Sequence, residues 1–285
     1  MMKRTTGRHN TQLFALPQPP PERVELGGVR YRLVRVFKHD FFAATCLYEA
    51  AADDLQARKP DAIARIVVKF GRTQVFCGLP TAWYAAFMRA HEEGIYRALA
   101  GIPGVPRWAG RVGENGYAIE YVDARPLDHL AGPPPGFFDR LREVLDAIHA
   151  RGVAYGDANK RSNILVGPGG EPFLVDYQIA LRRRDDLPWP IGAIVAAFVA
   201  YVQRSDLYHL YKHKRRLAPS ELRPQEEALS RRRGLLHTIH RKLTDPWRFL
   251  RRRFLRGQHR TGRLASPTAA LEDHHQPEKA TWRVD

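Results

Sequence analysis

Residues 155–181 constrain the fold of this chain more than any other stretch. A polar loop from Asp157 to Asn163 precedes the apolar run 164–166, and a turn rich in glycine and proline leads to a second apolar run that ends at Asp176. Two short strands joined by a tight turn would bring Asp157, Asn163 and Asp176 to one end of a hairpin. Such a set suits phosphoryl transfer from Mg-ATP, which needs oxygen ligands for the metal and an acid that orients the acceptor hydroxyl.

The order of these residues resembles the catalytic loop of protein kinases, H-R-D-x-x-x-x-N, followed by the metal-binding D-F-G. It is more similar still to minimal bacterial kinase-like proteins, among them the lipopolysaccharide core-sugar kinases and the RIO kinases. Two departures stand out: Tyr-Gly precedes Asp157 in place of His-Arg, and Tyr-Gln follows Asp176 in place of Phe-Gly. The resemblance implies an α+β, bilobal protein-kinase-like fold with a five-stranded N-lobe and a reduced helical C-lobe.

The polar loop is one residue longer than the kinase pattern, since Asn163 follows Asp157 by six positions instead of five. Either Asp157 still reaches the acceptor despite the extra residue, or Ala158 occupies the position of the base and the protein is inactive. We favour the active enzyme, because an inactive protein would have no evident reason to keep a metal-binding Asn and Asp without a base. A third interpretation is that Asp157 and Asn163 only cap a turn.

The composition is that of a soluble globular protein in a reducing compartment. The 285 residues are 44% hydrophobic, enough for one large core or two modest ones. Cys46 and Cys77 give no disulfide framework. The basic N-terminus lacks the apolar stretch of a signal peptide, and residues 187–202 suit a buried helix better than a membrane span. We therefore expect a cytoplasmic protein, peripheral at most to the inner face of a membrane.

The formal charge of +16 is concentrated near the C-terminus. Residues 204–263 hold 18 Lys and Arg against 5 Asp and Glu, which implies an anionic partner for this region. Within residues 226–256 we predict a basic amphipathic helix with Trp247 and Phe254 on its apolar side. Such a helix suits an anionic membrane surface, and packing on the C-lobe with a solvated basic face is the alternative. Nucleic acid ranks last among partners, because no RNA-binding motif is present.

The N-terminal half contains the periodic segments that a kinase N-lobe requires. We predict a disordered lead over residues 1–27, an N-lobe over 28–122 and a C-lobe over 123–225, followed by the amphipathic extension and a disordered tail over 257–285. Strands are expected at residues 31–37, 42–48, 65–70, 107–112 and 117–122, and helices at residues 81–99, 138–148, 191–203 and 205–214.

The resemblance also assigns nucleotide-binding residues. No glycine occurs between the first two strands, so Lys38 or His39 would supply charge to the phosphates there, unless the segment is a plain polar hairpin tip. Lys69 ends an apolar strand, as the kinase V-A-I-K lysine does, and would hold the phosphates. Its expected ion-pair partner is Glu93, with Glu92 as the alternative.

The remaining assignments complete the implied site. The backbone from Glu120 to Val122 resembles a kinase hinge that would bond the adenine edge. Asn163 and Asp176 would hold Mg²⁺ or Mn²⁺, and Lys160, or Arg161, would offset developing charge near Asp157.

The implied activity is transfer of the γ-phosphate of ATP to a hydroxyl group. The chain has no A-P-E motif and no long activation segment, so the peptide-docking platform of protein kinases is missing. Together with the basic tail and the resemblance to core-sugar kinases, this favours a lipopolysaccharide-core or other envelope sugar as acceptor. The alternatives are a RIO-like serine/threonine protein kinase and a non-catalytic, ATP-binding pseudokinase.

Overall fold

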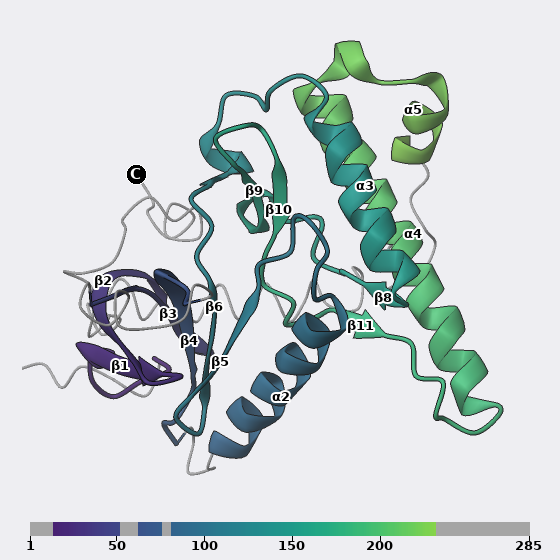
Figure 1. The fold of residues 1–285 in the computed structure, drawn as a ribbon. Helices are drawn as coiled ribbons and strands as arrows, with labels where there is room; N and C mark the ends of the chain where they lie inside the picture. The colour runs from purple at the N-terminus through teal and green to yellow at the C-terminus, as the bar shows by residue number, and fades with distance from the viewer. Residues whose placement is uncertain (1–13, 52–61, 76–80, 232–285) are drawn as a thin grey trace, which may run out of the picture. The chain divides into compact units, whose positions relative to one another are not determined.

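The computed structural model describes residues 14–51, 62–75 and 81–231, which form two compact units of mixed α+β structure (Figure 1). The first unit holds described residues 14–51, 62–75, 81–90 and 109–121, and the second holds 91–108 and 122–231. The α+β class is as predicted. The predicted tail helix beyond Arg231, with Trp247 and Phe254, and the predicted tail over 257–285 lie outside the described residues, as does Cys77.

The sheet of the first unit has six strands in the order β1-β2-β3-β4-β6-β5, and its pairings from β1 through β6 are antiparallel. Figure 1 shows it strongly curled. Two register shifts in β2, after Leu33 and after Val36, are irregularities of the kind that increase strand twist. The five predicted strands are confirmed as β2 (Val29–His39), β3 (Ala43–Ala50), β4 (Arg65–Gly71), β5 (Trp108–Val112) and β6 (Gly116–Glu120). The sixth strand is β1 (Arg23–Leu26).

The sixth strand, β1, corrects the prediction of a five-stranded sheet, and it also corrects the predicted disordered lead over residues 14–27, whereas residues 1–13 of that lead lie outside the described residues. Gly27 and Gly28 adopt positive φ angles and close a tight turn that pairs β1 with β2. Upstream, Phe14 is buried, and the buried guanidinium of Arg72 donates hydrogen bonds of 3.0 Å to the carbonyls of Phe14 and Phe41. Arg72 lies far along the chain, so the sequence pattern could not show its contact with Phe14, whereas the pairing of β1 with β2 is local.

The core of the first unit lies on one face of the sheet. Ile66 and Val68 of β4 point into it beside Cys46 and Tyr48 of β3. Because side chains alternate along a strand, Lys69 lies on the face opposite Val68. The predicted helix after β4 is confirmed as α2 (Ala82–Ala98).

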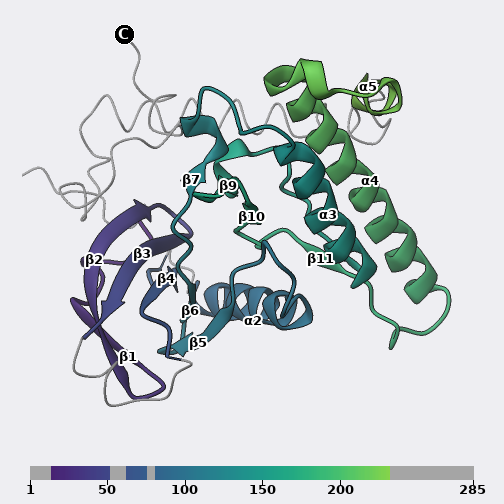
Figure 2. The same ribbon diagram turned by 45° about the horizontal axis from the view of Figure 1, so that its top comes forward.

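The second unit is built on α3 (Phe137–Ala150) and α4 (Ile191–Leu217), which lie side by side in Figures 1 and 2. The apolar face of α3 is buried as its spacing predicts, with Phe138, Leu141 and Ile148 in the core. The predicted hairpin is confirmed, because β9 pairs antiparallel with β10. The other elements are β7 (Arg125–Pro126), η2 (Leu127–His129), β8 (Val153–Ala154), η3 (Arg161–Asn163), β9 (Ile164–Val166), β10 (Pro172–Leu174), β11 (Leu181–Arg182), η4 (Pro219–Glu221) and α5 (Pro224–Arg231).

Residues 91–108 belong with the second unit, although the predicted N-lobe ran from 28 to 122. Gly104 explains this grouping. Its carbonyl accepts a hydrogen bond of 2.8 Å from the Leu174 amide, and a side chain in its place would meet the carbonyl of Pro172 at 2.6 Å. Glycine at this position therefore allows the close approach of the two backbones.

The two helices predicted over residues 191–203 and 205–214 are one helix, α4, of 27 residues. No proline or glycine interrupts it after Gly192, so the backbone hydrogen bonds continue through the predicted break at Arg204. Its first half is also not the buried helix expected, since Ile194 and Phe198 are exposed. Within the described ranges, no helix is long and apolar enough to cross a membrane.

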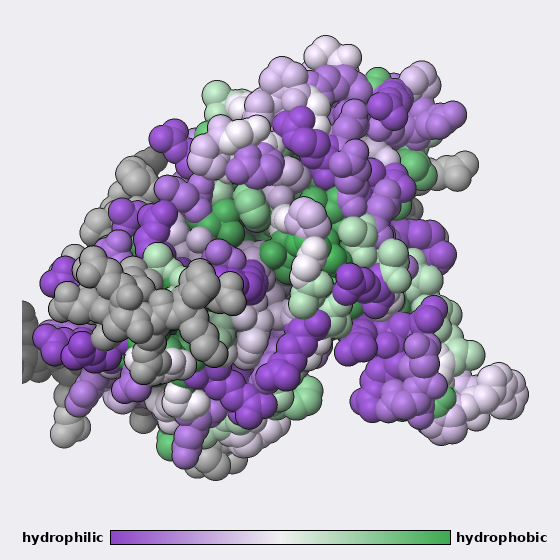
Figure 3. Space-filling model, in the orientation of Figure 1, coloured by the Kyte–Doolittle hydropathy of each residue, from purple (hydrophilic) through white to green (hydrophobic). Residues whose placement is uncertain are grey.

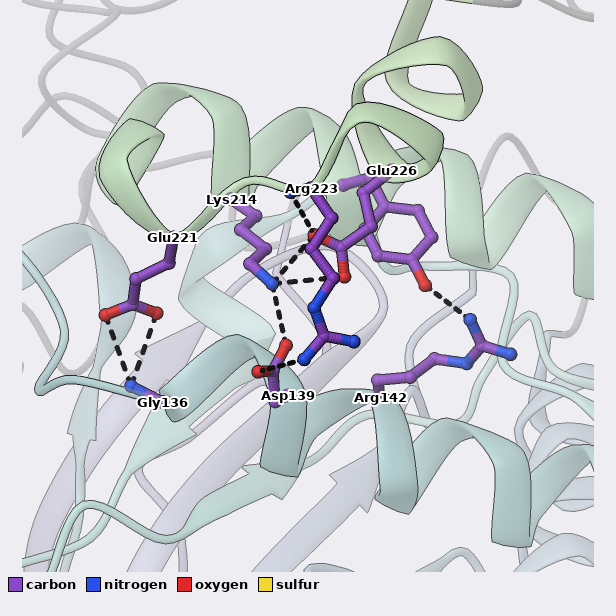
Figure 4. Close-up of polar contacts among 8 residues, drawn as sticks. Gly136, Asp139, Arg142, Lys214, Glu221, Arg223 and Glu226 are labelled. Carbon is purple, nitrogen blue, oxygen red and sulfur yellow. Dashed lines mark hydrogen bonds and ion pairs between the residues drawn. The ribbon is translucent and has the colours of Figure 1, made fainter.

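A buried ionic cluster joins α3, the end of α4 and α5 (Figure 4). The fully buried Nζ of Lys214 lies 2.7 Å from a carboxylate oxygen of Asp139 and 2.9 Å from one of Glu226. Glu221 accepts hydrogen bonds from the amide of Gly136, the residue that precedes α3. A carboxylate there compensates the positive end of the helix dipole.

Candidate functional site

The loop that carries the candidate residues runs from β8 to β9 in the second unit. Gly156, with φ of 79°, turns the chain out of β8 immediately before Asp157. The amide of Lys160 then donates to the carbonyl of Asp157 at 3.0 Å, and the amide of Asn163 donates to the carbonyl of Lys160 at 3.2 Å. These two consecutive turns bring residue 163 back beside residue 157.

The side chains of Asp157, Lys160 and Asn163 meet within this loop. One carboxylate oxygen of Asp157 accepts a hydrogen bond of 2.8 Å from the side-chain Nδ2 of Asn163 and lies 2.7 Å from Nζ of Lys160. Asp157 is buried, whereas Lys160 is half exposed. Burial raises the pKa of Asp157, and the opposing attraction of Lys160 does not cancel that effect. The loop thus holds a buried carboxylate beside a cation that solvent can reach.

Asp176 follows β10 and lies near enough that its charge also raises the pKa of Asp157. The segment is tied to the loop by the Val175 amide, which donates to the carbonyl of Asn163 at 3.1 Å. Asp176 adopts φ of 64°, and it is the one non-glycine residue with positive φ in the described part of the chain. Strained backbone of this kind persists where the surrounding structure holds it, often at functional sites.

Asp206 of α4 anchors the loop and was missed by sequence reasoning. Its two carboxylate oxygens accept hydrogen bonds of 2.8 Å from the amides of Tyr155 and Gly156, and Nε2 of His149 lies 3.1 Å away. Burial raises the pKa of Asp206, although His149 and the two amides oppose that shift. No sequence signal indicated this role, because Asp206 lies among polar and basic residues and resembles any carboxylate on a helix.

Two further residues of α4 bind the loop, at Ala158 and at Asn159. Ring nitrogen Nε2 of His213 donates to the carbonyl of Ala158 at 3.1 Å, and Nζ of Lys212 donates to the side chain of Asn159 at 2.9 Å. Burial lowers the pKa of His213 to about 4, so the ring is neutral at neutral pH. Ala158 is buried and its carbonyl contacts α4, whereas the carboxylate of Asp157 contacts Lys160.

Two buried tyrosines lie behind the candidate residues. The rings of Tyr155 and Tyr177 pack edge to face at 5.2 Å, and Tyr96 packs against Tyr177 at 5.0 Å. The hydroxyl of Tyr155 donates a hydrogen bond of 2.6 Å to the carbonyl of Val175. In the described part of the chain, the buried hydroxyl of Tyr177 has no hydrogen-bond partner.

Removing the two hydroxyl groups is expected to have opposite consequences. Tyr155→Phe should lower the free energy of unfolding by about 1–2 kcal/mol, because the carbonyl of Val175 then loses its donor. Tyr177→Phe should be neutral or stabilising, because it removes a buried polar group that is unpaired. The two variants control for each other, since both rings are fully buried. Urea unfolding measures both, and equal losses would contradict the hydrogen-bond assignment.

In the first unit, Lys69 lies on β4 opposite Thr45 of β3 and Tyr117 of β6. Its Nζ is 5.9 Å from the centre of the Tyr117 ring. Glu92 and Glu93, on the part of α2 that belongs to the second unit, are both buried, and Glu93 also pairs with Arg97 at 2.8 Å. Which glutamate pairs with Lys69 stays a prediction.

The predicted hinge lies at the end of β6, and the predicted hairpin tip lies between β2 and β3. Glu120 pairs with Ile66 at the end of β6, and the carbonyl of Val122 accepts a hydrogen bond of 2.9 Å from Ala124. At the tip between β2 and β3, Lys38 forms an ion pair with Asp40 at 2.8 Å. His39 is buried and accepts a hydrogen bond from the Leu16 amide at 3.1 Å. This arrangement favours a polar hairpin tip over a phosphate-binding role for Lys38 or His39.

No protein-family model matches this sequence, and no match was found among curated proteins.

Proposed function

We propose that this protein is an ATP-dependent phosphotransferase of bilobal protein-kinase-like fold, which moves the γ-phosphate to a hydroxyl acceptor. The observation that carries the proposal is the contact of Asp157 with both Lys160 and Asn163, in a loop whose following hairpin ends at Asp176. Phosphoryl transfer depends on positioning and on charge stabilisation, and the loop is held in place for both by Asp206.

Asp157 would orient the acceptor hydroxyl. A carboxylate in this role accepts the hydrogen bond of the hydroxyl and then its proton, and burial raises its pKa towards the working range of a base. Lys160 would stabilise negative charge that develops on the transferred group. The side chain in contact with Lys160 and Asn163 is the carboxylate of Asp157, whereas the contact given for Ala158 is that of its carbonyl with His213. The geometry thus favours the active enzyme over the inactive interpretation.

The metal ligands would be Asn163 and Asp176. Both present oxygen atoms, which Mg²⁺ and Mn²⁺ prefer. The side-chain nitrogen of Asn163 donates to Asp157, and its oxygen, which within the described residues accepts only a long hydrogen bond of 3.4 Å from the Ser162 hydroxyl, is the atom that would hold the cation. Among the described residues, no three His, Cys, Asp or Glu side chains form a metal cluster, so phosphate oxygens would complete the coordination. The metal would neutralise phosphate charge when bound.

Nucleotide binding would use the residues assigned from the resemblance. Lys69 would contact the phosphates and pair with Glu93, and the backbone of Glu120 and Val122 would bond the adenine edge. The acceptor would be a lipopolysaccharide-core or other envelope sugar at the inner face of the membrane. A RIO-like protein kinase is the second candidate. Incubation with γ-labelled ATP, envelope extract and generic protein substrates distinguishes the two by the product that becomes labelled.

Mg-ATP is expected to raise the thermal midpoint of the protein, and Asp176→Asn should remove the metal dependence of that rise. At a ligand concentration about a hundred times the Kd, binding stabilises by about 2.7 kcal/mol, or roughly 5–10 °C for a chain of this size. Asp185→Asn is the matched control, because its carboxylate is exposed and pairs only with Arg183 among the described contacts. The absence of any shift in the intact protein would rule out nucleotide binding.

A further inference from the structure

The first two turns of α4, together with Trp189 two positions before the helix, present an apolar surface to solvent. Trp189 is 86% exposed, Ile191 52%, Ile194 64% and Phe198 54%. These four residues are called the helix-end patch below. No charged residue occurs from position 187 to position 203. Single exposed apolar residues are ordinary, but four large ones in ten positions indicate an interaction surface.

The helix-end patch covers a wide part of the helix circumference. At 100° per residue, Ile191, Ile194 and Phe198 form one stripe, and the exposed Ala193 and Ala197 extend the apolar arc to about 160°. A flat protein partner would cover the stripe but leave the alanine side open to water. Lipid can contact the whole apolar arc of an inserted helix end, so a bilayer surface suits an apolar arc of this width.

The helix-end patch is also pre-organised. The amide of Gly192 donates to the carbonyl of Pro188 at 3.0 Å, and that of Ile194 donates to the carbonyl of Pro190 at 3.1 Å. A side chain at Gly192 would meet the carbonyl of Leu187 at 2.8 Å, so glycine allows this tight start of the helix. Trp189 is therefore held within a hydrogen-bonded turn, and insertion would require little ordering of the chain.

Basic residues border the helix-end patch at both ends of its sequence. The exposed arginines at 182–184 precede it and the exposed Arg204 follows it. The acidic residues beside it are Asp185 and Asp186, which pair with neighbouring arginines, so the net charge of these flanking residues is positive. In Figure 3 pale green and near-white surface along the lower end of α4 lies beside a strongly hydrophilic region. An apolar surface bordered by net positive charge complements anionic lipid headgroups.

We infer that the helix-end patch inserts into the interfacial region of an anionic phospholipid bilayer, with the flanking arginines at the lipid phosphates. Trp189, which precedes the helix, suits the interfacial region of a bilayer, because its ring is apolar and its N–H can reach water or headgroups. The surface is distinct from the amphipathic helix predicted within residues 226–256, and it involves none of the residues assigned to phosphate transfer. It would place the second unit directly against a membrane.

The test compares two equivalent changes in the full-length protein. Phe198→Asp places a charge in the helix-end patch, and Phe87→Asp places one at an exposed phenylalanine of α2 that is 61% accessible. Flotation uses vesicles of phosphatidylglycerol and phosphatidylcholine in equal parts, without nucleotide, at high salt, so that electrostatic attraction through the tail is screened. Phe198→Asp should weaken binding about tenfold or more, and Phe87→Asp should leave it unchanged.

Ile194→Asp provides a second variant in the helix-end patch and should weaken binding as Phe198→Asp does. If both variants bind vesicles like the unaltered protein, the inference is wrong. It is also wrong if Phe198→Asp only dissociates a dimer in analytical ultracentrifugation, because the helix-end patch would then join two copies of this chain. Without nucleotide in the assay, either failure leaves the proposed phosphate transfer to its own test.

Discussion

Asp157→Asn is expected to lower the rate of phosphate transfer by about a thousandfold while leaving Mg-ATP binding nearly unchanged. General-base and orienting carboxylates contribute about 10²–10⁴ to the rate. The substitution keeps the size of the side chain and an oxygen that can accept the contacts of Lys160 and Asn163. It removes the negative charge that orients and deprotonates the acceptor. Transfer of label from γ-labelled ATP measures the rate, and thermal shift measures binding.

Two controls make this result decisive. Asp185→Asn should transfer phosphate at the original rate, because its carboxylate lies exposed on the loop after β11. Lys160→Met should slow transfer less than Asp157→Asn, because a half-exposed cation is partly replaced by solvent and by the metal. An unchanged rate in Asp157→Asn would reduce Asp157 to a turn-capping residue. ATP binding without transfer by the intact protein would favour the pseudokinase alternative.

Lys214→Met is expected to lower the free energy of unfolding by about 3 kcal/mol or more, because loss of the lysine leaves the buried carboxylate of Glu226 uncompensated. Glu226 is buried and would face an apolar side chain, whereas Asp139 is partly solvated. Adding Glu226→Gln to Lys214→Met should recover part of the loss, since the double variant buries one charge fewer. Arg231→Met is the control for an exposed pair, worth about 0.5 kcal/mol or less. Urea unfolding compares all three.

The effect of Lys214→Met should depend on pH. Burial opposes the charge of Lys214, but its hydrogen bonds to Asp139 and Glu226 outweigh burial and raise its pKa. The contribution of Lys214 is therefore full at neutral pH and is lost only as pH rises through that raised value. The hydrogen bond from Lys214 lowers the pKa of Asp139, so its contribution is lost as pH falls through the lowered value. The difference between variant and original should be largest between about pH 4 and pH 10. A constant difference across that range and beyond it would contradict the ion-pair assignment.

Local patterns in the sequence were enough for most elements of the fold. The apolar runs on either side of the turn at 167–170 predicted the β9–β10 hairpin, and the spacing of Phe138, Leu141 and Ile148 predicted α3. These patterns succeed because side-chain periodicity and turn chemistry act over a few residues. They also indicated that Asp157 and Asn163 would lie together, since the loop between them is short.

Contacts between distant parts of the chain were decided only by the tertiary structure. The hydrogen bonds from Tyr155 and Gly156 to Asp206 join residues about fifty positions apart, and in the sequence Asp206 resembles any carboxylate on a helix. Lys214 lies in a run of basic residues that is typical of a solvated helix face, yet its side chain is fully buried and contacts two carboxylates. The apolar run at 187–202 shows the reverse, because its pattern indicates burial while its first half is exposed. Periodicity records which residues could be buried, whereas burial itself depends on which surfaces the rest of the chain brings against them.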